Sequence, residues 1–205
     1  MGVLGGKLTV PQTENTEERE ARLGRIAHQI RQCTRCKLCK GRSNAVPGSG
    51  PARADVFFLG EGPGAREDEQ GLPFVGRSGR YLDRLLESVG LNREQVFITN
   101  VVKCRPPSNR DPHVSEVDAC TPYLDGQLQI IRPRLVVTLG RFAMRRFFSD
   151  GQISEIHGQP RRVNATVYLP LYHPAAALYR GSLRAVVEED FQKIRWLLRD
   201  PSRLP

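Results

Sequence analysis

The sequence predicts an α/β fold, with a mostly parallel central sheet and helices on both of its faces. Four short apolar runs are candidate buried strands, and the segments between them carry apolar residues at helical spacing. Strands and helices that alternate four times favour parallel pairing, because each crossover helix carries the chain back over the sheet. We expect strands at residues 55–60, 95–99, 135–139 and 166–171, and helices at residues 15–32, 78–89, 116–131, 141–148 and 182–199.

The chain should begin with a disordered lead at residues 1–14, which are Gly-rich and polar. Residues 15–205 are expected to form one domain, because a chain of 205 residues can build one sizeable core. The first helix has acidic residues early and basic residues late, which suits the helix dipole. Its apolar face consists of Leu23, Ile26, Ala27 and Ile30.

The first strand leads into a long Gly-rich loop, residues 60–79, at the carboxyl edge of the sheet. Open α/β folds bind their ligands at that edge. Glycines early in the loop let the backbone approach a ligand closely, and Phe74 is an apolar residue with little other reason to lie there. Acidic side chains lie in the same loop at Glu61, Glu67, Asp68 and Glu69.

Polar residues also follow two of the other strands. The second strand leads to Asn100 and then to a Pro-rich loop, and the fourth is followed by His173. Residues 152–163, between the third and fourth strands, are expected to form a small hairpin or an irregular loop. Because parallel strands end at one edge of a sheet, we expect that edge to gather Glu61, Asn100 and His173.

The charge balance favours a nucleic-acid partner. The net charge is +9, and five of the 31 basic residues are Lys, so 26 are Arg, whose planar fork suits phosphate. No apolar run approaches the ~20 residues of a spanning helix. The N-terminus has no signal-peptide core. We therefore expect a cytoplasmic protein with no membrane partner.

Five cysteines in such a chain argue against a disulfide scaffold. Cys33 and Cys36 form a CxxC pair, which by itself is weak, but Cys104 and Cys120 follow around a Pro-rich loop and favour a four-thiolate metal site. Four thiolates suit either zinc or an iron–sulfur cluster. The 67 residues between the two pairs are unlike the spacing of a compact zinc ribbon.

Several motifs together resemble the family 4 uracil-DNA glycosylases, the iron–sulfur members of the uracil-DNA glycosylase superfamily. The resemblance runs from about residue 33 to residue 195 and keeps the order of the motifs. It implies a three-layer α/β/α fold around a four-stranded parallel sheet. The motifs are CTRCKL at 33–38, GEGPG at 60–64, GLPFVG at 71–76, TNVVKCRPP at 99–107 and YHPAAAL at 172–178.

The resemblance implies a monofunctional enzyme, here a monomer, that flips uracil out of DNA, hydrolyses its N-glycosidic bond and leaves an abasic site. Phe74 would stack on the base. Asn100 would form hydrogen bonds with the Watson–Crick edge of uracil, where cytosine has its donor and acceptor in exchanged positions. His173 would stabilise the departing uracil anion. The implied uracil-binding residues are Glu61, Gly62, Pro63, Phe74, Asn100 and His173.

Glu61 and His173 are the implied catalytic residues. A related glycosylase family carries an Asp where Gly62 stands here, so the residue that activates water is open. Glu61 is the first candidate, and Glu67 and Asp68 are the second candidates.

The resemblance also implies a [4Fe–4S] cluster on Cys33, Cys36, Cys104 and Cys120. Cys39 is an extra cysteine, and it is the alternative to Cys33 as a ligand. The cluster would join the first helix to the loop at 105–110, which would contact DNA phosphates. Other phosphate contacts are expected from Arg77, Arg80, Arg105, Arg110, Arg180 and Arg184. The segment Leu178–Arg180 is either a wedge that fills the hole left by the base or an ordinary loop.

Two other functions are open. Gly60–Ala65 nearly fits the GxGxxA pattern of a dinucleotide-binding domain, although that domain wants an acid where Asn100 stands. The other is a non-catalytic iron–sulfur protein of the same superfamily that binds nucleic acid.

Overall fold

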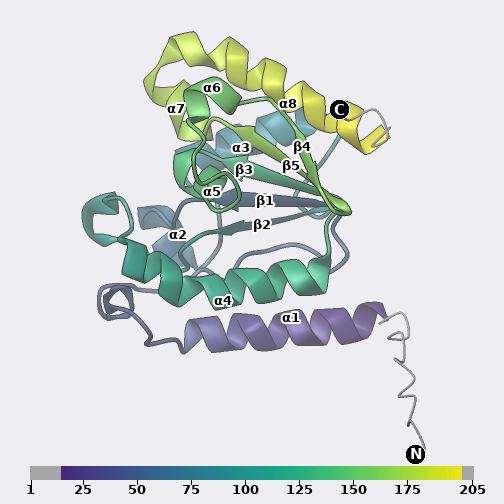
Figure 1. The fold of residues 1–205 in the computed structure, drawn as a ribbon. Helices are drawn as coiled ribbons and strands as arrows, with labels where there is room; N and C mark the ends of the chain where they lie inside the picture. The colour runs from purple at the N-terminus through teal and green to yellow at the C-terminus, as the bar shows by residue number, and fades with distance from the viewer. Residues whose placement is uncertain (1–14, 200–205) are drawn as a thin grey trace, which may run out of the picture.

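The computed structural model describes residues 15–199, and the lead expected at residues 1–14 lies outside them. A five-stranded sheet in the order β2-β1-β3-β5-β4 forms its centre (Figure 1). The four predicted strands are confirmed, and all four pair in parallel. They are β1 (Val56–Gly60), β2 (Val96–Asn100), β3 (Leu135–Leu139) and β5 (Thr166–Leu171).

The expectation of four strands misses β4 (Arg161–Val163), which pairs antiparallel with β5 at the edge of the sheet. All three residues of β4 are exposed, so no apolar run marks this strand in the sequence. Residues 152–163 do not form a hairpin of their own: they contain a short helix, Ile153–Ile156, and then β4, whose hairpin partner is β5.

Two helical layers cover the sheet, as predicted. On one face lie α1 (Thr16–Arg31) and α4 (Val114–Ile131), which run side by side (Figure 1). On the other face lie α3 (Arg77–Ser88), α7 (Pro174–Tyr179) and α8 (Arg184–Arg199). The short helices are α2 (Ala65–Gln70), α5 (Arg141–Arg145) and α6 (Ile153–Ile156), with single turns at Lys37–Lys40, Pro107–Asn109 and Gly181–Leu183.

Every residue of β1, β2 and β3 is buried, because helices cover both faces of the sheet. Successive side chains of a strand point to opposite faces. Phe57 therefore stacks on Phe97 in the core under α4, with ring centroids 5.3 Å apart. Phe58 stacks on Phe191 of α8 in the other core, at 5.9 Å.

The loop at residues 60–79 differs from its prediction, because it contains the helix α2. Glu67 caps this helix by accepting from the backbone N–H of Gly64 at 3.1 Å. Within residues 15–199, no helix has the length and apolarity needed to cross a membrane.

Candidate active site

The register of the sheet brings the predicted site residues to one edge. Gly60 at the end of β1 pairs with Asn100 at the end of β2. A Cβ on Gly60 would overlap the side-chain oxygen of Asn100 and lie 2.7 Å from the ring of Phe74. Phe74 in turn stacks on His173, with centroids 5.5 Å apart and ring planes at 26°. Asn100 and Phe74 therefore meet at a backbone position that only glycine can occupy, and His173 adjoins them through the ring of Phe74.

The Phe74 loop, residues 71–76, is held by one side chain from α2 and one from the turn before β2. Phe74 adopts a left-handed φ of 54°, which is uncommon for a residue with a side chain. Glu67 of α2 accepts from the backbone N–H groups of Val75 and Gly76, both at 2.8 Å. Arg93, just before β2, donates to the carbonyl of Pro73 at 3.0 Å and to the carbonyl of Phe74. The sequence analysis missed Arg93, since it lies outside every motif.

The side-chain oxygen of Asn100 is buried and has no hydrogen-bond partner among the described residues. The residue is only 2% exposed. Buried polar atoms in folded proteins are nearly always paired, so an orphaned amide oxygen at the ligand-binding edge of a sheet marks a place for a ligand donor.

His173 is oriented by its own helix. Its Nδ1 accepts from the backbone N–H of Ala175 at 3.1 Å, at the start of α7. Because Nδ1 is an acceptor there, the ring proton of the neutral form lies on Nε2. Burial lowers the pKa of His173 to about 4, although the charge of Glu67 acts in the opposite direction. His173 is therefore a neutral donor at physiological pH.

Glu61 follows β1 and is partly buried. Burial, followed by the nearby charge of Asp111, raises the pKa of Glu61, and Arg141 acts in the opposite direction. Arg141 and Asp111 form an ion pair at 2.5 Å. A carboxylate with a raised pKa at the ligand-binding edge of a sheet has the character of a general base.

The two alternative acids have structural partners instead. Asp68 is 4% exposed and accepts from the backbone N–H groups of Ser43 and Asn44 at 3.0 and 3.4 Å. Glu67 is occupied by backbone N–H groups on both sides of the Phe74 loop. Each carboxylate therefore closes a loop.

The cysteines come together from three segments: the chain after α1, the loop after β2, and α4. Cys33, Cys36, Cys39, Cys104 and Cys120 line one pocket with Tyr123, and all five are free thiols. No three His, Cys, Asp or Glu side chains among residues 15–199 are placed to hold a metal ion. The five thiols line the wall of a shared pocket.

Hydrogen-bond donors point at these sulfurs. Arg42 donates to Sγ of Cys104 at 3.0 Å and to the carbonyl of Arg31 at 2.7 Å. The backbone N–H of Arg35 lies 3.5 Å from Sγ of Cys33. Burial raises the pKa of Cys104 to about 11, although Arg42 favours its thiolate. Donors aimed at these sulfurs favour thiolates, the form in which cysteines bind metals.

Comparison with known sequences decides the family. The profile of the Uracil DNA glycosylase superfamily matches residues 47–195. The chain belongs to this superfamily. It is 48% identical over 172 residues to a Type-4 uracil-DNA glycosylase of Sulfurisphaera tokodaii, covering 79% of this chain and 78% of the relative.

Two further relatives carry the same name. The Type-4 uracil-DNA glycosylase of Archaeoglobus fulgidus is 46% identical over 76% of this chain and 82% of its own length. That of Thermotoga maritima is 42% identical over 77% of this chain and 85% of its own length. The resemblance to family 4 is thereby confirmed.

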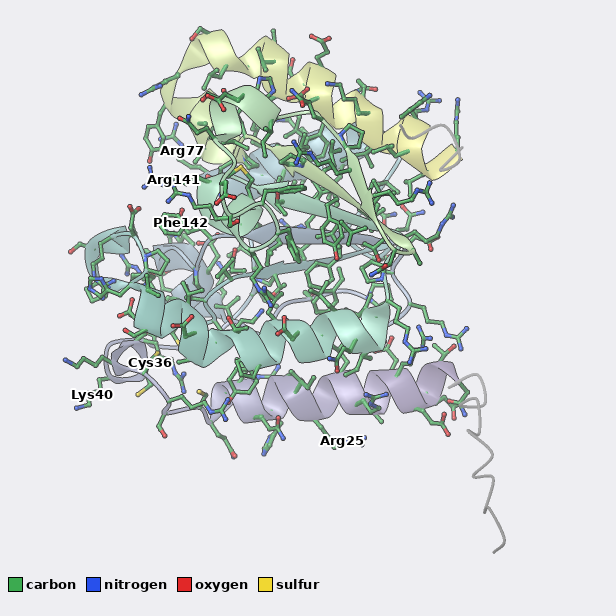
Figure 2. All side chains as sticks on the ribbon, viewed as in Figure 1. Arg25, Cys36, Lys40, Arg77, Arg141 and Phe142 are labelled. Carbon is green, nitrogen blue, oxygen red and sulfur yellow. The ribbon has the colours of Figure 1, made fainter. Side chains whose placement is uncertain are left out.

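Two of the arginines that were expected to contact DNA phosphates are already paired within the fold of this uracil-DNA glycosylase superfamily member. Arg110 forks onto Glu116 at 2.7 and 2.9 Å, and Arg184 pairs with Glu188 at 2.9 Å, so both have carboxylate partners within the fold. Figure 2 shows Arg77, Arg141 and Phe142 on the same side of the molecule in this view. The guanidinium of Arg141 lies 5.1 Å from the centre of the Phe142 ring, and it is also paired with Asp111 at 2.5 Å.

Proposed function

We propose that this protein is a uracil-DNA glycosylase that removes uracil from DNA and leaves an abasic site. The observation that carries the proposal is that Asn100 and Phe74 meet at Gly60 and that His173 stacks on Phe74. The family relationship supports it, since the relatives are named for this activity. The substrate is uracil-containing DNA, and the enzyme acts as a monomer.

Recognition rests on the amide of Asn100. Its oxygen accepts from N3–H of uracil, and its NH₂ group donates to O4. Cytosine has an acceptor at N3 and a donor at C4, so it leaves both amide groups unpaired. A site that depends on hydrogen bonds rejects such a base strongly, because buried polar groups would lose their partners. Phe74 stacks on the flipped base, which contributes about 1–3 kcal/mol. The backbone of Gly62 and Pro63 forms one side of the proposed uracil site.

Bond breakage relies on His173. The electron pair of the C1′–N1 bond moves into the uracil ring, and negative charge develops at O2. Nε2–H of the neutral imidazole donates to O2, as an oxyanion hole does. Glu61 accepts a proton from the water that adds to C1′, and the uracil anion takes up a proton on release. The raised pKa of Glu61 supports its role as the base.

Cys33, Cys36, Cys104 and Cys120 hold a [4Fe–4S] cluster, with Cys39 outside the ligand set. The shared pocket and the donors aimed at the sulfurs support this assignment. When bound, the cluster ties the end of α1 to α4 and to the Pro-rich loop after β2. Purified protein should be brown and contain iron and sulfide, whereas a colourless zinc protein would contradict the assignment.

Leu178–Arg180 forms the wedge that replaces the flipped base. Leu178 packs against the core, whereas the side chain of Tyr179 is 85% exposed at the end of α7, six residues after His173. Tyr179 is therefore the residue that enters the duplex. Arg77 and Arg141 contact phosphates beside it.

A labelled oligonucleotide with a single uracil tests the function. The holoprotein should release uracil, and alkali should then cleave the strand at the abasic site, whereas the matched cytosine and thymine strands should stay intact. Asn100→Ala and His173→Ala should each abolish most excision. His28→Ala, on the outer part of α1, is the matched control and should excise at the wild-type rate. Binding of uracil DNA without release would favour the non-catalytic alternative instead.

A further inference from the structure

Lys103 is a buried lysine that no motif assignment explains. It is 1% exposed and lies three residues beyond Asn100, directly before Cys104. Its Nζ donates to the side chain of Thr99 at 2.7 Å, to the carbonyl of Asn100 at 2.8 Å and to the side chain of Gln127 at 2.8 Å. The three N–H bonds of the ammonium thus have three acceptors.

The acceptors belong to the base-recognition strand and to α4. Thr99 and Asn100 end β2, whereas Gln127 lies in α4. Thr99 and Gln127 both also donate to the carbonyl of Pro47, at 2.9 and 2.7 Å. The network is therefore closed, and it clamps the last residues of β2 against α4 from the side opposite the base.

The other side of Lys103 faces the thiols. Lys103 lines the same pocket as the five cysteines. Burial raises the pKa of Cys120, whereas a hydrogen bond from the backbone of Lys103 and the charge of its side chain act in the opposite direction. One residue thus contacts both the carbonyl of Asn100 and a proposed cluster ligand.

A buried ammonium is costly, and apolar residues of similar volume often stabilise a fold as well or better. Its presence here is best explained by a need for one fixed geometry. The amide of Asn100 faces the base, and the orientation of that amide follows from the backbone of Asn100. A shift of about 1 Å in a positioned group can cost on the order of 100-fold in rate.

We propose that Lys103 is a positioning residue that holds the backbone of Asn100 in register for uracil and ties it to the thiolate site behind. The inference rests on the proposed function. Lys103 acts on the reaction only through Asn100, so its contribution should vanish when the Asn100 amide is absent.

A double-mutant cycle tests this dependence. Lys103→Met, Asn100→Ala and the double variant are purified with their clusters, and visible absorption and iron content verify the loading. Single-turnover excision of uracil should fall on the order of 100-fold in Lys103→Met. The double variant should be no slower than Asn100→Ala alone. Affinity for abasic DNA should stay within about twofold of wild type, because the phosphate contacts are unchanged.

Control variants distinguish a positioning role of Lys103 from a loss of folding stability and from a failure of the proposed glycosylase activity. Lys193→Met, on the outer face of α8, is the matched change and should excise at the wild-type rate. Should Lys103→Met lose its cluster, Gln127→Met, which removes one acceptor, takes its place in the cycle with the same expected dependence. Equal fractional losses with and without the Asn100 amide would overturn the positioning role. A wild-type protein that releases no uracil would instead overturn the proposed function.

Discussion

The substitution Gly79→Ala should displace the Phe74 loop and slow the excision of uracil. Gly79 lies in the first turn of α3, against the backbone of the Phe74 loop. A Cβ at this position would overlap the carbonyl carbon and oxygen of Phe74 and lie 3.0 Å from its Cα. No side-chain rotation relieves a clash between a Cβ and a backbone, so the loop or the helix must move.

The size of the effect follows from two opposing terms. Alanine is favoured over glycine inside a helix by roughly 0.8–1.0 kcal/mol. Overpacking of a rigid site costs typically 1–3 kcal/mol, so Gly79→Ala should lower the free energy of unfolding by up to about 2 kcal/mol. Relief of the overlap moves Phe74 by about 1 Å or more, and excision should fall on the order of 100-fold.

Gly24→Ala is the matched control, because it makes the same change inside α1 with nothing within 4 Å of the new Cβ. It should keep the wild-type excision rate and raise the free energy of unfolding by up to about 1 kcal/mol. Denaturant unfolding and single-turnover excision measure both quantities for each variant. Wild-type excision by Gly79→Ala would refute the argument that the position of the Phe74 loop limits the reaction.

Three further outcomes are expected. Burial raises the pKa of Glu61, so the charged form of Glu61 lowers the free energy of unfolding once the pH rises through that pKa. Glu61→Gln should therefore resist denaturant better than wild type at neutral pH and no better in acid. The same variant should lose most of its single-turnover excision. A hydrogen bond from Arg110 lowers the pKa of Glu116 from 4.5 to about 2. The contribution of the Glu116 carboxylate to the free energy of unfolding is therefore complete above pH 4.5 and is lost as the pH falls towards 2. Acid unfolding of Glu116→Gln should lack this loss. Arg42→Met removes the donor to Cys104 and should speed bleaching of the brown colour in air, and unchanged bleaching would show that this hydrogen bond does not protect the cluster.

The sequence by itself determined the four parallel strands and the edge at which the candidate site lies. Apolar runs report burial one residue at a time, and the crossover rule turns four buried runs into a parallel sheet. The same rule placed Asn100 and His173 at one edge before any coordinates existed. The short exposed β4 had no such signal, because its pairing with β5 is what makes it a strand.

Only the tertiary structure decided how the acids, Lys103 and Gly79 are used. The Gly-rich loop carries several carboxylates with similar local sequence, and folding buries Asp68 against one loop while it leaves Glu61 partly buried near Asp111 and Arg141. Lys103 meets Gln127 across 24 residues of chain. Such contacts depend on how loops and helices pack in three dimensions, and hydrophobic periodicity carries no information about distances between residues that are far apart in the chain.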